Sequence, residues 1–268
     1  MNRIDLRFQE LRRKREPAFI PYLTAGDPDM HATRELILEA ERRGADLIEL
    51  GVPFSDPIAD GPVIQASHLR ALEGGTRVGD VLAMVREVRN TSEIPIVAMI
   101  SCSIVFRKGA DGFIRSMAEA GIDGATIPDL PVEEAGQARD AADRAGLHLA
   151  PFVTPTTTIK RQEAICRAAR GFIYYISVVG LTGAREQLAG DLKANVDRIR
   201  AAAKVPVAVG FGVSRPEHAR EVGAVSDGVI VGSALVRLIS ENAGAGIATL
   251  RSRFGDAVGQ LSSAAKQR

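Results

Sequence analysis

The run Ala18-Phe-Ile-Pro-Tyr-Leu23 is continuously apolar and lacks the polar alternation of a half-exposed strand. Continuous apolarity is typical of a parallel strand that is covered on both faces. Seven similar runs follow along the chain, at residues 46–50, 94–99, 124–127, 148–153, 171–176, 205–209 and 227–231. Segments with a helical pattern lie between them and end at glycines, and the clearest are residues 31–43, 109–120, 132–145 and 215–222.

Eight such strand-and-helix units in a chain of 268 residues predict an α/β fold, the (β/α)8 or TIM barrel. A doubly wound open sheet is disfavoured because no Gly-x-Gly-x-x-Gly motif follows the first run. An extra N-terminal helix is expected before the first strand, with Ile4, Phe8 and Leu11 on its apolar side. No linker or low-complexity stretch divides the chain, so residues 1–268 are expected to form a single TIM-barrel domain.

The composition disfavours several classes of function. A net charge of +1 disfavours a broad nucleic-acid-binding surface, and 4% aromatic residues without tryptophan disfavour a stacking platform for single strands. The basic run Arg12–Arg15 is interpreted as the solvated end of a helix, with a nucleic-acid or membrane contact as the alternative. Charges throughout the first ten residues, two cysteines and the absence of a long apolar run predict a cytoplasmic protein without membrane segments.

Two carboxylates fall at the end of the second run and in the loop after it, where barrel enzymes place their active sites. Glu49 interrupts an apolar strand and shares a side with Leu47, in either the barrel interior or the helix layer. Burial would raise its pKa toward the range useful for acid–base catalysis, and the alternative is a buried salt bridge. Asp60 lies in the following loop of residues 51–61, as a second acid–base group or as a residue of a turn.

Glycine-bearing segments follow the last three predicted strands, at residues 180–183, 210–212 and 232–233. Glycine lets backbone N–H groups approach an anion, and Ser233 begins a short helical segment whose N-terminus favours phosphate. Together they predict a phosphate site. The four histidines are scattered without metal-ligand spacing, so no metal is expected, and the absence of lysine from the predicted strands disfavours a Schiff base.

Several motifs together resemble the tryptophan synthase α subunit family. They are Phe19-Ile-Pro-Tyr-Leu-Thr-Ala-Gly-Asp-Pro28, Leu50-Gly-Val-Pro-Phe-Ser-Asp-Pro-Ile-Ala-Asp-Gly-Pro-Val-Ile-Gln65, Pro128-Asp-Leu-Pro-Val-Glu-Glu134, Gly180-Leu-Thr-Gly183 and Gly210-Phe-Gly212. The resemblance runs from about Phe19 to Ile239, and the stretch 53–65 is its most specific part. It implies a TIM barrel with an extra N-terminal helix.

The resemblance also implies an activity, the retro-aldol cleavage of indole-3-glycerol phosphate to indole and glyceraldehyde 3-phosphate without metal or cofactor. It gives Glu49 the main acid–base role and places Asp60 at the indole N–H, with Tyr174 as an active-site tyrosine. Tyr22 and Val153 match positions of the pocket wall. The remaining substrate-binding positions carried over are Thr182, Gly183, Phe211, Gly212, Gly232 and Ser233, most of them at the phosphate.

Two aryl-pocket positions and one position toward the partner depart from the family pattern. Ser101 stands where the family usually has tyrosine, Ser103 where it has an asparagine toward the β subunit, and Thr126 where it has leucine. These departures leave open an altered aryl specificity. Three functions therefore stay open: an α subunit that works in an αββα complex with a pyridoxal-phosphate β subunit, a stand-alone lyase, and, disfavoured by Glu49 and Asp60, a non-catalytic partner.

Overall fold

The computed structural model describes residues 2–177, 185–210 and 212–267. Within these ranges nine parallel strands form one sheet in the order β5-β4-β3-β2-β1-β9-β8-β7-β6. The strands coincide with the eight predicted apolar runs. They are β1 (Ala18–Thr24), β2 (Ile48–Gly51), β3 (Ile96–Met99), β4 (Gly124–Thr126), β5 (His148–Leu149), β6 (Phe152–Val153), β7 (Ile173–Ile176), β8 (Val207–Gly210) and β9 (Gly228–Val231).

The sheet closes into a barrel at a strand that is broken in the middle. The two outermost strands of the order, β5 and β6, are consecutive in the chain and are separated only by Ala150 and Pro151. The amide of Ala150 donates to the carbonyl of Ala125 at 2.9 Å, and the carbonyl of Pro151 accepts from Tyr174 at 3.0 Å. One strand therefore joins β4 on one side and β7 on the other, which confirms the predicted TIM barrel.

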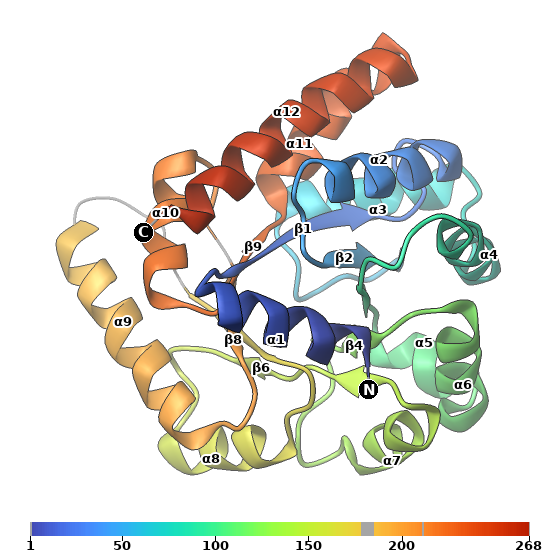
Figure 1. The fold of residues 1–268 in the computed structure, drawn as a ribbon. Helices are drawn as coiled ribbons and strands as arrows, with labels where there is room; N and C mark the ends of the chain where they lie inside the picture. Colours follow the sequence, from blue (N-terminus) through green and yellow to red (C-terminus); the bar gives the residue numbers. More distant parts are fainter. Residues whose placement is uncertain (1, 178–184, 211, 268) are drawn as a thin grey trace.

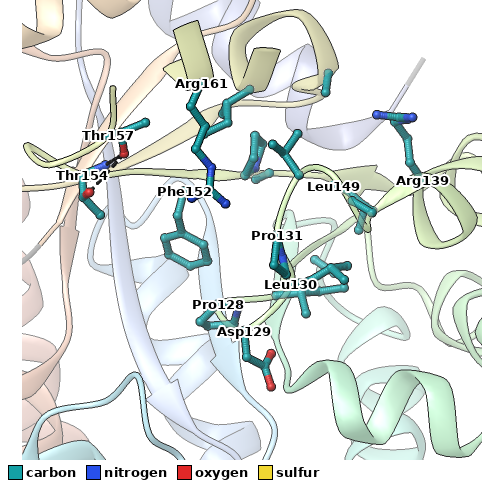
Figure 2. A pocket seen from close by; sticks show the side chains of 18 residues that line it. Pro128, Asp129, Leu130, Pro131, Arg139, Leu149, Phe152, Thr154, Thr157 and Arg161 are labelled. Carbon is teal, nitrogen blue, oxygen red and sulfur yellow. Dashed lines mark hydrogen bonds between the residues drawn. The ribbon is translucent and has the colours of Figure 1, made fainter. Parts of the chain in front are cut away.

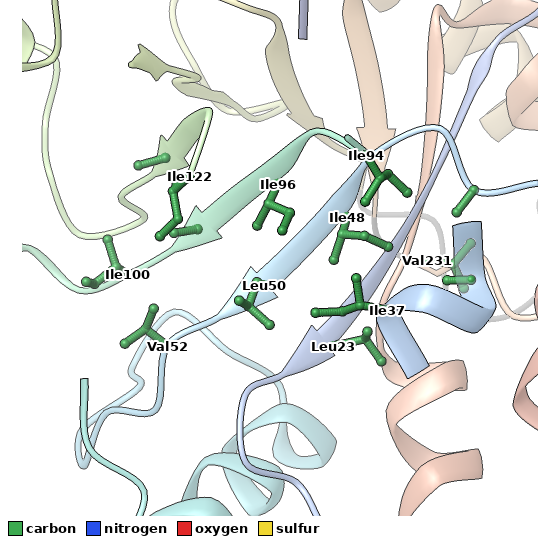
Figure 3. Packing of buried hydrophobic residues seen from close by; sticks show 14 of the residues in the cluster. Leu23, Ile37, Ile48, Leu50, Val52, Ile94, Ile96, Ile100, Ile122 and Val231 are labelled. Carbon is green, nitrogen blue, oxygen red and sulfur yellow. The ribbon is translucent and has the colours of Figure 1, made fainter. Parts of the chain in front are cut away.

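Side-chain alternation along the strands separates two apolar regions. Ile20, Leu47, Val97 and Phe172 belong to an interior cluster, whereas their neighbours point outward to the helices. Figure 3 shows outward-facing residues such as Ile48, Leu50 and Ile96 packed together with residues of a covering helix.

Helices surround the sheet (Figure 1). They are α1 (Arg3–Lys14), α2 (Met30–Arg42), α3 (Pro62–Glu73), α4 (Val78–Arg89), α5 (Cys102–Arg107), α6 (Ala110–Ala120), α7 (Gly136–Ala145), α8 (Ile159–Ala168), α9 (Arg185–Ala202), α10 (Pro216–Val225), α11 (Ser233–Asn242) and α12 (Ile247–Lys266), with a 3₁₀ turn at Ala243–Ala245. The predicted helix at 132–145 begins later, at Gly136, because residues 132–134 form a turn. None of the helices in the described ranges is long and apolar enough to cross a membrane.

The predicted N-terminal helix closes one end of the barrel. Asn2 caps α1 by accepting the amide of Ile4 at 2.9 Å. Ile4, Phe8 and Leu11 pack into the interior cluster, where the ring of Phe8 lies 6.0 Å from that of Phe172. Apolar side chains thus fill the end of the barrel at which the strands begin, and the candidate active-site cavity lies at the other end.

The contact between α10 and α12 supplies a test of the packing. A Cβ at Gly223 would lie 2.1 Å from the backbone carbonyl oxygen of Ala265. We expect Gly223→Ala to lower the free energy of unfolding by about 1–3 kcal/mol, because two helix backbones must separate. Gly259→Ala on α12 is the control, since nothing lies within 4 Å of its Cβ position. Alanine there should stabilise by up to about 1 kcal/mol. Equal urea midpoints for the two variants would contradict the close helix contact.

Candidate active site

Glu49 lies inside the barrel on β2, opposite Tyr22 of β1 and Val97 of β3. Glu49 is 2% exposed, and the hydroxyl of Thr126 donates a hydrogen bond to its Oε1 at 3.5 Å. Among the described residues no cation forms an ion pair with it, so the alternative of a buried salt bridge finds no support there. Burial, followed by the charge of Asp60, raises the pKa of Glu49 to about 8. The carboxyl group is therefore mostly protonated at neutral pH.

Asp60 lies in the loop that joins β2 to α3 and faces the same cavity as Glu49. Its backbone amide donates to Pro57 at 3.0 Å, and its carbonyl accepts from the side chain of Gln65 at 2.8 Å. Burial, with a smaller contribution from Asp129, raises the pKa of Asp60 to about 6. Two carboxyl groups with different pKa values therefore face one space, which is an arrangement suited to a proton donor beside a hydrogen-bond acceptor.

The cavity has a volume of about 630 Å³, and its lining residues fall into two chemically different groups, which we call the aromatic end and the anion end. One end has Glu49 and Asp60 among apolar or aromatic side chains, namely Tyr22, Ile64, Met99, Phe152 and Tyr174. The other end has small residues and one cation, namely Gly212, Ser214, Gly232, Ser233 and Arg237. The chemistry of this lining suits a ligand that has an aromatic part and an anionic group.

Two tyrosine hydroxyls approach the backbone of neighbouring strands inside the barrel. A Cβ at Gly51 would lie 2.0 Å from the hydroxyl of Tyr22, and a Cβ at Gly210 would lie 2.6 Å from that of Tyr174. Tyr174 also packs its ring 4.8 Å from that of Phe152. Both glycines therefore make room for the tyrosines that line the cavity with Glu49.

The anion end is built around the start of α11. Ser233 is the first residue of this helix and Gly232 is its N-cap, so free backbone N–H groups face the cavity. Gly212 adopts a φ of +83°, which favours glycine. Sequence reasoning missed Ser214 and Arg237, although Arg237 lies one helical turn after Ser233. The predicted residues Thr182, Gly183 and Phe211 lie outside the described residues.

The structure does not bring three of the predicted positions, Val153, Ser101 and Thr126, to the cavity wall, and Thr126 lies buried against Glu49 instead. Val153 points outward into the core between sheet and helices, and its neighbour Phe152 lines the cavity instead. The alternation along the strand was the signal that could have identified Phe152. Ser101 caps α5, and its hydroxyl donates to Asp129 at 2.6 Å. Met99, two residues earlier, occupies the wall beside Asp60.

A second cavity, of about 350 Å³, lies beside the first between the segments that follow β4 and β6. Figure 2 shows Phe152 and Pro128, which both cavities share, and Arg161 reaching in from α8. The wall is mostly apolar, and Asp129 is its one carboxylate among the described lining residues. It therefore lacks the carboxylate pair of the first cavity. Within the described ranges no group of His, Cys, Asp and Glu could hold a metal ion.

The chain matches the family model described as tryptophan synthase alpha chain over residues 8–265. Two relatives with this name come from Citrifermentans bemidjiense, at 47% identity over 91% of this chain and 92% of theirs, and Geotalea uraniireducens, at 46% identity over 99% and 98%. The solved tryptophan synthase subunit alpha of Legionella pneumophila has a TM-score of 0.91 and 37% identity, with 98% of each chain covered. A solved tryptophan synthase complex from Pyrococcus furiosus has a TM-score of 0.82 and 35% identity, with 92% of this chain and 98% of that chain covered.

The raised pKa of Glu49 predicts a pH-dependent stability difference. Between pH 4.5 and about 8 the folded state holds a proton that the unfolded state releases, so this group makes stability fall as pH rises. Glu49→Gln removes the effect. We expect its free energy of unfolding relative to the parent to increase by up to about 1.4 kcal/mol per pH unit in this window. Urea unfolding at pH 5, 7 and 8.5 measures it, with exposed Glu73→Gln as control. A difference that stays constant with pH would contradict the burial of Glu49.

Proposed function

The chain belongs to the tryptophan synthase alpha chain family, and we propose from the geometry of its cavity how it cleaves indole-3-glycerol phosphate to indole and glyceraldehyde 3-phosphate. The reaction makes it a carbon–carbon lyase of tryptophan biosynthesis. The observation that carries the residue assignments is the pair Glu49 and Asp60, two carboxyl groups with raised pKa values at the aromatic end of one cavity.

Protonated Glu49 gives its proton to C3 of the indole ring and becomes a carboxylate. The carboxylate then takes the proton of the hydroxyl on the adjacent glyceryl carbon, and the bond between C3 and this carbon breaks. Its electrons return to the indole ring while the hydroxyl becomes the aldehyde. Glu49 ends protonated, as it began, so the cycle requires no other proton source. A pKa of about 8 suits a group that must both give and take a proton near neutral pH.

Asp60 acts at the ring nitrogen. Above a pH of about 6 its carboxylate accepts a hydrogen bond from the indole N–H, which becomes more acidic once C3 is protonated. Tyr174 lies beside Glu49 and contributes to the low-dielectric wall around it. Thr126, predicted as an aryl-pocket residue, reaches Glu49 instead and orients its carboxyl group with the hydrogen bond at 3.5 Å.

The phosphate binds at the opposite end, against the backbone of Gly212, Gly232 and Ser233. Arg237 has no ion pair among the described residues, and its positive charge attracts the phosphate from the cavity rim. Thr182, Gly183 and Phe211 stay predictions for this end. In this mechanism the protein supplies only proton transfers and hydrogen bonds to the cleavage, and it needs no cofactor, metal or Schiff base. A cytoplasmic location also stays a prediction from the sequence.

The partner we propose is a tryptophan synthase β subunit in an αββα complex. Three large apolar side chains are exposed on segments that follow strands at the catalytic end: Ile58 at 85%, Phe106 at 40% and Ile159 at 65%. Such residues around a catalytic opening support docking of a partner subunit there. A stand-alone lyase is the alternative, and the relevant test compares indole release with and without an added β subunit.

Glu49→Gln tests the acid–base assignment. The amide keeps the size of the side chain but cannot exchange a proton, so we expect kcat to fall by at least about 10²–10⁴-fold. The assay is indole release from indole-3-glycerol phosphate, with circular dichroism as a check of folding. Binding of glycerol phosphate should be unchanged. A variant that retains more than half of the parent turnover would remove Glu49 from the mechanism.

Ser233→Asp tests the phosphate end. A carboxylate at the start of α11 repels the substrate phosphate, so we expect a higher KM and weaker competition by glycerol phosphate, with a much smaller change in kcat. The matched control is Ser240→Asp, an exposed serine two turns further along the same helix. Similar KM values for the parent and Ser233→Asp would show that the phosphate binds elsewhere.

A further inference from the structure

His68 is a buried histidine on α3 that sequence reasoning set aside with the scattered histidines. Its residue is 4% exposed, and both ring nitrogens have partners. Nδ1 lies 3.1 Å from the backbone amide of Phe54, which donates to it. Nε2 lies 3.1 Å from the hydroxyl of Tyr22. The ring thus joins α3, the loop after β2 and the wall of the catalytic cavity.

The contact with Phe54 determines which nitrogen carries the proton. A backbone N–H can only donate, so Nδ1 must offer its lone pair and the proton of the neutral ring lies on Nε2. Nε2–H then donates to the Tyr22 hydroxyl. Burial lowers the pKa of His68 to about 4, so the ring stays neutral across the working range. His68 is therefore a fixed donor and acceptor instead of a proton-transfer group.

The two hydrogen bonds of His68 restrain the loop after β2 and the side chain of Tyr22, which have few other contacts that fix them. The loop residues Ser55, Asp56, Ile58 and Ala59 are exposed, so the loop packs little apolar surface against the barrel. Its start is bonded to His68 through Phe54, and its end is bonded to α3 through Gln65 and the Asp60 carbonyl. Both hydrogen bonds connect the loop to α3, and the side chain of Asp60 at the end of this loop faces the cavity.

Tyr22 depends on the same histidine. Its hydroxyl occupies the space that Gly51 leaves free and is buried, so it needs hydrogen-bond partners there. His68 supplies one at 3.1 Å and Thr24 a longer one at 3.3 Å. Nε2 also lies 3.9 Å from Oδ2 of Asp60. One ring thus adjoins both the aromatic wall and the carboxylate that faces it.

We propose that His68 is a positioning residue of the active site, which holds Tyr22 against the substrate ring and keeps the loop closed so that Asp60 faces the indole N–H. The inference rests on the proposed function of Asp60. The titratable groups that surround Asp60 are Glu49, Tyr22, Tyr174, His68 and Asp129, from β2, β1, β7, α3 and the segment after β4. None of these five groups is a fixed cation, so burial is the main cause of the raised pKa of Asp60, and the position of the loop sets that burial.

Three substitutions in the full chain separate the two bonds. His68→Leu removes both, His68→Asn keeps an acceptor near Nδ1 for Phe54, and His68→Gln keeps a donor near Nε2 for Tyr22. We expect His68→Leu to lower kcat/KM by about 10²-fold, as for a displacement of about 1 Å in a catalytic group. The asparagine and glutamine variants should each lose less. His148→Leu is the control, because His148 bonds to Asp5 at 2.9 Å at the opposite end of the barrel.

The pH profile distinguishes positioning from general destabilisation. In the parent, kcat/KM should fall as pH drops through about 6, where Asp60 becomes protonated. Freeing the loop exposes Asp60 to water, so His68→Leu and His68→Gln should move this acid limb to lower pH. His68→Asn and His148→Leu should keep it. An unchanged kcat/KM and acid limb in His68→Leu would overturn the proposal.

Two NMR measurements test the proposal without depending on the catalytic activity of the variants. Nitrogen-15 NMR of the histidine-labelled parent at pH 7 should show Nδ1 of His68 unprotonated and Nε2 protonated, and a proton on Nδ1 would overturn the proposal. Carbon-13 NMR of the Asp60 carboxyl group gives its pKa in each variant without catalysis. If His68→Leu does not fold, the comparison of His68→Asn with His68→Gln tests the proposal, because only the glutamine variant should shift the pKa of Asp60. A folded parent that releases no indole would instead count against the proposed function.

Discussion

The register between neighbouring strands is the constraint on which the rest of the structure depends, and three aspartates hold it. Asp46, Asp123 and Asp227 immediately precede or lie just before strands β2, β4 and β9. The side chain of each aspartate accepts a hydrogen bond from a backbone amide of the neighbouring strand segment, at 2.8 to 2.9 Å. The backbone amide of the aspartate donates to the carbonyl of that same residue at 2.9 Å. Because side chains alternate along a strand, a slip of one residue would turn Glu49 from the cavity to the helices.

The aspartates that hold the register and the carboxylates of the cavity differ in their electrostatic partners. Asp46 has Lys266 at 2.8 Å, Asp123 has Arg89 at 2.8 Å, and Asp227 has Arg200 at 3.2 Å. Glu49 has a hydroxyl and no ion pair within the described ranges. A buried carboxyl group without a cation is held mainly as its neutral acid, which costs stability at high pH. The barrel thus uses ion-paired carboxylates for register at one end, and at the other end it holds Glu49, the carboxyl group to which we assign proton transfer.

Different kinds of interaction close the two ends of the barrel. At the strand N-termini, α1 packs three apolar side chains, Ile4, Phe8 and Leu11, into the interior cluster. At the strand C-termini, the inward positions carry Tyr22, Glu49, Phe152 and Tyr174, and glycines on adjacent strands make room for the tyrosines. The loop with Asp60 covers this end through hydrogen bonds to α3 instead of a large apolar contact. Exposed apolar residues around the opening are consistent with a partner subunit that completes the cover.

Much of the fold was determined by local sequence patterns. Continuous apolar runs specify buried parallel strands, and the phase of alternation places Glu49 on the same side as Leu47 whatever the packing. The start of α11 at Ser233 and the role of Ile4, Phe8 and Leu11 were readable for the same reason, since caps and helix faces depend on neighbours a few residues apart. Only the tertiary structure decided that the side shared by Glu49 and Leu47 is the barrel interior. It also decided that Phe152 instead of Val153 faces the cavity, that Ser101 turns to Asp129, and that His68 meets Tyr22 and Phe54. Those contacts join segments far apart in the chain, and their geometry follows from barrel closure and strand register, which no local pattern encodes.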